Sequence, residues 1–449
     1  MCVPILAAVR PTIGAVLLFV SLALILVSRA QAAPLRQADD APEEVWLQNH
    51  AEVTLWSDDP ASGQAVASIP QFLGYFRAQA PFQMERGWIF VYYPGDTSGV
   101  QPGYVWVDGR ALGPAGAPPS PGLLDRPLPS LGSIDDIFLA VPEPVAGPEA
   151  ERVRTLIATG DVIPARYVDI QIRARGNDFL YPMAETAEVL READLTLINL
   201  EAPLIANCPA HWDGFQFCGQ PGFVEALVEA GVDVAGLENN HIGNYGPDGV
   251  VATVALLHEH GIDHADRRTL AVRDVRGLRF GFLAFNGVGE RIDRAAMAAT
   301  IGEAAEQVDV LVVAIHWGQE YVAVPQAAPG VAPDDPVAIA HLAIDAGAGL
   351  VIGNHPHWVQ AVELYDGKLI AYAHGNFIFD QMWSLPTRQG VVGRYTFYDD
   401  RLVRVEYLPV LIEDSAQPRF VAGEEAQAIL DRMYEASQAL AEELGAGLR

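Results

Sequence analysis

Basic residues are scarce in this chain of 449 residues. Lysine and arginine together number 28, against 57 aspartates and glutamates, and the formal net charge is −29. A surface with this charge repels phosphate backbones and anionic lipid headgroups, so we expect no nucleic-acid partner and no peripheral docking on an anionic membrane. Hydrophobic residues make up 50% of the chain, which is enough for a sizeable core in two or three domains.

The N-terminus contains almost no charge. After Arg10, residues 11–28 ("PTIGAVLLFVSLALILVS") are uncharged and almost wholly apolar. A helix of about 18 residues barely spans a bilayer, and the "AQA" at residues 30–32 is typical of a signal-peptidase site. Residues 1–33 are therefore predicted to be a cleaved signal peptide or a retained membrane anchor, with a buried helix as the weaker alternative. In either of the first two cases the remaining chain lies outside the cytoplasm, membrane-anchored or secreted.

Only three cysteines are present, and Cys2 precedes the apolar run. The other two, Cys208 and Cys218, lie ten residues apart in "NCPAHWDGFQFCGQ". In an exported chain this spacing favours one local disulfide. A zinc site is the poorer interpretation, because His211 alone lies nearby and a structural zinc ion usually has four ligands.

Residues 45–110 have the pattern of a small all-β domain. Five aromatic and β-branched runs are separated by Gly, Pro, Asp and Ser, which predicts short strands in a barrel or sandwich. The segments "TLWSD", "VYYPG" and "GYVWVD" resemble a bacterial SH3-like domain, whose aromatic side chains would bind peptide or glycan or else form the core. The proline- and glycine-rich residues 111–150 are expected to be an extended linker.

Residues 151–413 have the pattern of an α/β domain. Continuous apolar strands alternate with helical segments, as in "RVRTLIATGD", "DLTLINLE" and "VDVLVVAIHWG", so the sheet is expected to be covered on both faces. Two hairpins follow, with turns at residues 366–367 and 399–400. The remaining residues, 414–449, are predicted to form a C-terminal amphipathic helix.

Polar side chains stand where these strands end. In open α/β sheets, ligands bind at the carboxyl ends of the strands, so we expect the side chains to converge there. Each side chain, taken singly, also fits a structural role without a metal, such as a helix cap, a solvated loop acid or a core histidine. As a set, their carboxylate, amide and imidazole groups suit Mn, Fe or Zn ions. The candidate ligands are Asp161, Glu201, Asn240, His316, His355 and His357.

The segment "VIGNHPHWVQ", residues 351–360, is the least easily dismissed as chance. On an extended segment, His355 and His357 would point to the same side. Burying two imidazoles side by side costs desolvation free energy unless they bind something.

Five ordered motifs give the chain a family resemblance. They are "ATGDVIPAR", "NLEAPL", "NNHIGNYG", "IHWGQEY" and "GNHPHWVQAVELYDGKLIAYAHGNFIFDQ". They resemble the CapA family of poly-γ-glutamate capsule synthesis proteins, within the calcineurin-like metallophosphoesterases. The resemblance covers residues 153–412 and implies a four-layer α-β-β-α sandwich with a site for two divalent ions.

The resemblance also implies a role for each candidate. Asp161 and His357 would hold the first ion, and Glu201 would bridge to the second. The second ion would also be held by Asn240, His316 and His355. His241 would be free of metal and would protonate a leaving oxygen. The residues expected to contact substrate or support the ligands are Asn199, Asn244, Glu320, Tyr321, Asn354 and Asn376.

Two positions depart from the family pattern. Ile163 stands where the wider superfamily has histidine, as is usual within CapA proteins themselves. Asn244 stands where those proteins usually have aspartate. An amide in that position would leave His241 less basic than a carboxylate would.

Three functions fit these observations. The first is a CapA-like exported protein that acts on an anionic envelope polymer, in contact with capsule-synthesis membrane proteins, through a metal-dependent hydrolase site. The second is a non-catalytic envelope scaffold on the same fold, and the third is a stand-alone exported phosphoesterase. Since the chain itself is acidic, a bound metal or a basic strip would have to mediate contact with such a polymer. Arg166, Arg173 and Arg175 are the candidates for that strip.

Overall fold

The computed structural model describes seven strands between residues 44 and 115, residues 131 and 133–138, and residues 152–445. The chain divides into two compact units, Met1–Ala117 and Pro118–Arg449. The predicted signal peptide or anchor, residues 1–33, lies outside the described residues. Among the described residues, no helix combines the length and the apolar character needed to cross a membrane.

The first unit contains one antiparallel sheet in the order β3-β2-β6-β5-β4-β1-β7. The five expected runs contain six of these strands, because the first run holds both β1 and β2. The seventh strand lies in the expected linker and pairs with β1. The SH3-like identity of this unit stays a prediction. The strands are β1 (Glu44–Asn49), β2 (Val53–Trp56), β3 (Ala65–Ile69), β4 (Tyr75–Gln79), β5 (Trp88–Tyr93), β6 (Gly103–Asp108) and β7 (Leu112–Ala115).

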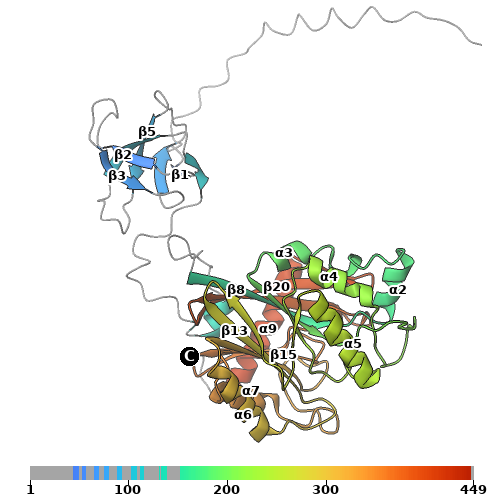
Figure 1. Ribbon diagram of the computed structural model, residues 1–449. Helices are drawn as coiled ribbons and strands as arrows, with labels where there is room; N and C mark the ends of the chain where they lie inside the picture. The colour runs from blue at the N-terminus through green and yellow to red at the C-terminus, as the bar shows by residue number, and fades with distance from the viewer. Residues whose placement is uncertain are drawn as a thin grey trace, which may run out of the picture. The chain divides into compact units, whose positions relative to one another are not determined.

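The second unit contains two sheets (Figure 1). The larger has the order β11-β10-β9-β8-β19-β20-β21, with β18 paired to β8. Its parallel half comprises β8 (Val153–Val162), β9 (Leu195–Leu200), β10 (Val234–Gly236), β11 (Asp263–Ala265) and β18 (Asn376–Ile378). Its antiparallel half comprises β19 (Gln389–Tyr398), β20 (Arg401–Glu413) and β21 (Gln417–Phe420).

The smaller sheet has the order β12-β13-β14-β15-β17-β16. Its central strands are parallel, so the carboxyl ends of β13, β14 and β15 share one edge. The strands are β12 (Ala271–Val275), β13 (Leu278–Asn286), β14 (Val310–His316), β15 (Leu350–Asn354), β16 (Val362–Tyr365) and β17 (Lys368–Ala371).

The two sheets pack face to face with helices outside both. Alternate strand residues point to opposite faces, so Ala158 joins the core between the sheets and Ile157 joins the core beneath the helices. Helices α2 (Tyr167–Ala174), α3 (Ala187–Arg191), α4 (Val224–Glu229) and α5 (Gly246–Glu259) cover the larger sheet. Helices α6 (Arg294–Ala305) and α7 (Pro336–Asp345) cover the smaller one. This is the expected four-layer α-β-β-α sandwich. The short helices are η3 (Tyr181–Met183), η4 (Pro221–Phe223) and α8 (Leu385–Arg388).

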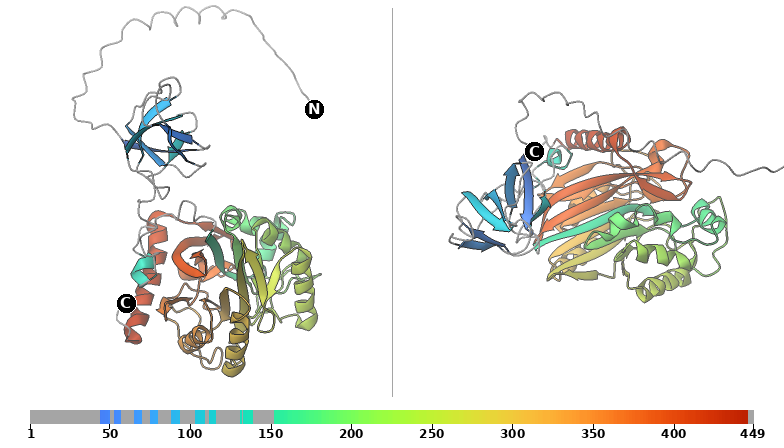
Figure 2. Two further views of the ribbon diagram at one scale, coloured as in Figure 1. Left: turned by 60° about the vertical axis from the view of Figure 1, so that its left-hand side comes forward. Right: turned by 90° about the horizontal axis from the view of Figure 1, so that it is seen from above.

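Helix α9 (Gly423–Glu443) lies along one side of the sandwich (Figure 2). Its Ile429 and Met433 are buried in the core between the sheets, and its Ser437 accepts a hydrogen bond from the Val362 amide at 2.9 Å. The short helix α1 (Ile134–Phe138) packs beside it, with Asp135 bonded to Tyr434. The prediction that residues 111–150 are extended throughout was therefore wrong, because α1 lies within them and adds apolar side chains to this core.

The predicted disulfide between Cys208 and Cys218 is present in the loop that follows β9. Both cysteines are buried. We expect replacing both with serine to lower the free energy of unfolding by about 2–3 kcal/mol, because the open loop is freer in the unfolded chain. Urea unfolding of the oxidised wild type and the double variant measures this, and equal midpoints would contradict it.

Glycine allows two strands to approach other backbone closely just before they reach the polar edge. A Cβ on Gly160 would lie 2.0 Å from the carbonyl oxygen of Gly375, and a Cβ on Gly353 would lie 1.9 Å from that of Tyr372. Neither space can accept a methyl group without moving backbone. These glycines therefore fix the positions of the residues that follow them.

We expect Gly353→Ala to destabilise the fold by roughly 1–3 kcal/mol, because overpacking displaces β15 or β17. Gly302→Ala, within helix α6, is the matched control. Among the described residues, a Cβ at this position would meet only the carbonyl oxygen of Ala346, at 3.8 Å. The control should be neutral or stabilising by up to about 1 kcal/mol. Thermal unfolding of both variants decides, and equal effects would contradict the close-approach explanation.

Candidate metal centre

The predicted ligands converge at the carboxyl edge of the two sheets. Asp161 lies at the end of β8, opposite Asn199 of β9, and Glu201 follows β9 directly. His316 ends β14, opposite Asn354 at the end of β15. Parallel strands bring these ends together, and the large-sheet residues meet the small-sheet residues across the gap. The structure thus places all six candidates in one cluster: Asp161, Glu201, Asn240, His316, His355 and His357.

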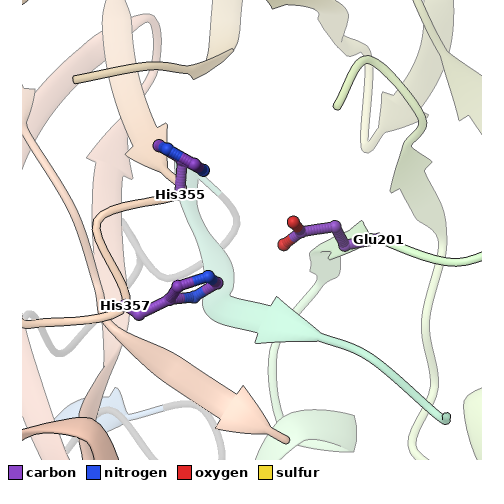
Figure 3. Close-up of side chains that lie close together, drawn as sticks. All are labelled: Glu201, His355 and His357. Atoms are coloured by element: carbon purple, nitrogen blue, oxygen red, sulfur yellow. The ribbon is translucent and has the colours of Figure 1, made fainter. Parts of the chain in front are cut away.

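Glu201 lies at the middle of this cluster. Its carboxylate points toward His355 and His357 (Figure 3). It also belongs to a second group of potential ligand atoms, with Asp161 and His316, and the atoms in each group lie within 4.8 Å of one another. The family resemblance implied a bridging role for Glu201, which stays a prediction and is compatible with its membership of both groups. The groups place His355 with His357 and Asp161 with His316, whereas the resemblance implied Asp161 with His357 and His316 with His355.

The carboxylate of Glu201 is fully buried, yet neither oxygen has a hydrogen-bond partner among the described residues. His316 Nε2 approaches Oε1 to 3.3 Å without hydrogen-bond geometry. Burial, followed by the negative charge of Asp161, raises the pKa of Glu201 well above its ordinary value. A buried, unpaired carboxylate is costly. A cation at this position would remove the cost.

His316 and Asn240 meet Glu201 from the other side. His316 Nε2 lies 2.8 Å from Asn240 Oδ1 and 3.3 Å from Glu201 Oε1. Burial lowers the pKa of His316 to about 3, so its imidazole is neutral and can donate a lone pair. Ligand atoms that bind one ion at about 2.0–2.2 Å lie roughly 3 Å from one another. The two distances from His316 Nε2 fit that spacing.

His357 is oriented by two acceptors. Asn376 uses its Nδ2 on Gln381 and on the Thr387 carbonyl, so its Oδ1 faces His357 Nδ1 at 2.9 Å. Asp161 Oδ2 lies 3.1 Å from the same nitrogen. Nδ1 therefore carries the hydrogen, and Nε2 is the nitrogen available to a metal. Burial opposes charge on this imidazole, but Asp161 outweighs it and raises the pKa of His357 to about 9.

His355 is buried, and within the part of the chain that the structure describes neither ring nitrogen has a hydrogen-bond partner. Burial lowers its pKa well below the ordinary value, so it too is a neutral potential ligand. The expected extended geometry was wrong, because β15 ends at Asn354 and the φ angles of His355 and His357 are 95° and 57°. A left-handed turn, rather than strand alternation, brings both imidazoles into the cluster.

His241 lies beside the cluster in the loop before α5. Its Nδ1 is 3.0 Å from Asn244 Oδ1, which also accepts the Phe217 amide hydrogen at 2.7 Å. Because that oxygen can only accept, His241 Nδ1 must donate, and Nε2 is left for substrate or water. Burial lowers the pKa of His241 to about 4. The amide of Asn244 supplies no charge that would raise it.

The other predicted residues lie around the ligands. Glu320 Oε1 is 3.9 Å from His355 Nε2, and the Tyr321 ring centroid is 6.2 Å from that of His357. Asn199 donates to Asp161 Oδ1 at 2.8 Å. Asn354 is buried, and its side-chain amide nitrogen has no hydrogen-bond partner in the described ranges.

The proposed basic strip is not a free surface. Arg166 is buried and forms an ion pair with Asp380, while its guanidinium lies over Phe217 and Phe379. Arg173 pairs with Asp169, and Arg175 stacks on Tyr181. These contacts hold α2 and the disulfide loop in place.

Asn239 is a supporting residue that the sequence did not single out. Its Nδ2 donates to Asn199 Oδ1 and the Leu200 carbonyl, and its Oδ1 accepts from the amides of His241 and Ile242. It therefore joins the β9 end to the loop that carries Asn240 and His241. The adjacent pair "NN" was a signal, because one amide can orient the loop while the other serves the cluster.

We expect Glu201→Gln to stabilise the metal-free protein at pH 8 by at least about 1 kcal/mol, because it removes an unpaired buried charge. A carboxyl whose pKa is raised on folding loses stability as pH rises above its unfolded pKa of about 4.3. The wild type treated with chelator should therefore weaken from pH 5 to pH 8 more steeply than Glu201→Gln. Urea unfolding at both pH values measures the difference.

Glu229→Gln, at an exposed position on α4, is the matched control for that comparison and should retain the wild-type pH dependence. Added Mn²⁺ should raise the unfolding midpoint of the wild type and of this control, but not that of Glu201→Gln. A Glu201→Gln protein less stable than wild type without metal would show that the carboxylate is not an orphaned charge.

Comparisons with known proteins give one consistent family. The model of the family "Bacterial capsule synthesis protein PGA_cap" matches residues 155–381, just over half of the chain and the whole ligand cluster. "Capsule biosynthesis protein CapA" of Bacillus anthracis is 25% identical over 301 residues, covering 61% of this chain and 71% of that one. "PGA biosynthesis protein CapA" of Bacillus subtilis is 26% identical over 279 residues, covering 57% and 71%. A "Probable polyglutamine synthesis accessory protein" of Mycobacterium tuberculosis is 31% identical over 284 residues, covering 54% and 70%.

Proposed function

This chain belongs to the bacterial capsule synthesis protein family PGA_cap, and on that premise we propose that it acts in the synthesis, export or remodelling of an anionic envelope polymer, poly-γ-glutamate. The names of the Bacillus and Mycobacterium relatives support a capsule or polyglutamate setting. The N-terminal sequence supports action outside the cytoplasm, in a membrane-anchored or secreted form, beside capsule-synthesis membrane proteins.

The site proposed for this function is a metal-dependent hydrolase centre with two divalent ions, of Mn, Fe or Zn. The observation that carries it is the buried Glu201 carboxylate, which has no hydrogen-bond partner among the residues that the structure describes and is shared by two groups of potential ligands. Two such ions supply a nucleophilic water and neutralise the charge that develops on a phosphoryl or carbonyl centre. The ligands would be Asp161, Glu201, Asn240, His316, His355 and His357.

The protein's own side chains prepare the site for this chemistry. Asn376 and Asp161 hold the His357 ring so that Nε2 faces the cluster. His241, held at Nδ1 by Asn244, presents Nε2 as the atom that accepts a proton and returns it to a leaving group. Its neutral form dominates at neutral pH, so we propose that it first acts as a base, where the resemblance alone implied an acid.

We expect the full chain, loaded with Mn²⁺, to hydrolyse either poly-γ-glutamate or a generic phosphodiester. Asp161→Ala and His316→Ala should each bind less metal by elemental analysis and lose at least about 100-fold in turnover, since both are potential ligands. His374→Ala is a control for loss of a buried histidine, because His374 bonds Thr159 and Tyr395 outside the ligand groups. It should keep its metal.

The outcomes separate the three functions. Turnover of polyglutamate alone supports the polymer-directed enzyme, whereas turnover of the phosphodiester alone supports a stand-alone phosphoesterase. A folded wild-type protein that binds no metal and is inert toward both substrates after Mn²⁺ is added would overturn the proposal. The non-catalytic envelope scaffold would then be the better description.

A further inference from the structure

A cavity of about 560 Å³ opens beside the ligand cluster. It lies at the carboxyl ends of β10 and β13, where ligands of α/β sheets bind, and its volume falls within the range of about 300–1,000 Å³ common for small-molecule sites. Asn240 lines it, and the same amide lies 2.8 Å from His316 Nε2. Gly287, next to the lining residue Asn286, donates to the His316 carbonyl at 2.8 Å. The cavity and the ligand cluster are therefore adjacent and share Asn240.

The charged lining of this cavity has an unusual arrangement. Arg267 lies between two carboxylates, with Nε 3.3 Å from Glu238 Oε1 and Nη1 3.2 Å from Glu290 Oε1. Among the described residues these contacts engage Nε and Nη1, so Nη2 can donate to an incoming carboxylate. The side chains of Arg267 and Glu290 are about half exposed, at 48% and 50%. Each can therefore exchange its ion pair for a contact with a ligand while the backbone stays folded.

The remaining wall contains polar side chains, among them Asp266, His264 and Asn244, and an apolar patch. Val250 and Val254 of α5 and Val288 after β13 line the cavity. The ligand that fits has a short aliphatic segment and a head that carries one ammonium and one carboxylate. The ammonium would lie against Glu238 and Glu290, and the carboxylate against Arg267. An α-amino acid group with a methylene side chain has this chemistry.

We propose that the cavity binds the amino-terminal residue of a γ-linked glutamate chain by its free α-ammonium and α-carboxylate. The inference rests on the proposed function and specifies how the polymer enters. In a γ-linked chain only the first residue carries both groups on one carbon, because every other nitrogen is in an amide. Interior residues offer carboxylates alone, which Glu238 and Glu290 repel. A protein with a net charge of −29 thereby selects the one cationic position of an anionic polymer.

This binding mode places the first amide bond toward Asn240 and the cluster. Hydrolysis there joins a water oxygen to the γ-carbonyl carbon and breaks the bond from that carbon to nitrogen. The leaving nitrogen takes a proton from that water. One free glutamate and a chain shortened by one residue, with a new amino terminus, are the products.

The test is calorimetric binding of two probes to the full chain loaded with Mn²⁺, at 0.15 M salt. One probe is a γ-linked glutamate pentamer with a free amino terminus, and the other is the same pentamer N-acetylated, which lacks the ammonium. We expect the free pentamer to bind at least about 10-fold more tightly than the acetylated one. Arg267→Gln and Glu290→Gln should each reduce that preference to about 2-fold or less.

Arg279→Gln is the matched control. Arg279 is exposed to the same degree as Arg267 and also pairs with a carboxylate, that of Asp309, but it lies near the opposite end of β13. This variant should keep the wild-type preference. Equal binding of the two pentamers by wild type, binding of neither, or an undiminished preference in Arg267→Gln would each overturn the inference. Metal content and phosphodiester turnover of the same sample show independently whether the metal centre itself stands.

Discussion

The site depends on one unfavourable arrangement: a carboxylate is buried among imidazoles, and no described group donates a hydrogen bond to it. In the described part of the chain, Glu201 has no hydrogen-bond partner for either oxygen, and His355 has none for either nitrogen. Desolvation alone would expel such groups or force a proton onto the carboxylate. A cation reverses the balance, because one charge compensates the carboxylate and coordinates the neutral imidazoles at once. The surrounding fold is a frame that holds these groups in position for the cation.

The frame is built from backbone that approaches closely and turns sharply. Gly160 and Gly353 let β8 and β15 lie against neighbouring backbone immediately before the ligands. Beyond the strands, His355 and His357 adopt positive φ, a conformation that costs about 1 kcal/mol or more for a residue with a Cβ. Tyr321 and Arg166, which flank the cluster, also adopt positive φ. Strain of this kind is common where a site must be held in one geometry.

The sequence predicted the composition of the site better than its local geometry. Continuous apolar strands ending in Asp161, Glu201 and His316 were sufficient, because parallel strands bring their ends to one edge whatever the loops do. The same reasoning could not find the turn at His355 and His357, since positive φ is only modestly enriched in histidine and leaves no clear pattern in the sequence. It also misassigned Arg166 to the surface, because a partner 214 residues away buries it. Helix α1 was missed because its apolar side chains pack into a core that includes α9, at the far end of the chain.

The central claim is that divalent cations occupy the cluster around Glu201. Anomalous scattering at a metal absorption edge, from crystals of the full chain grown with Mn²⁺, tests it without reliance on any substrate. We expect two peaks roughly 3.5–4 Å apart, one on each side of the Glu201 carboxylate, with His316 and Asn240 on one and His357 on the other. Crystals with no anomalous peak near Glu201, and with ordered water bonded to its carboxylate instead, would contradict the claim.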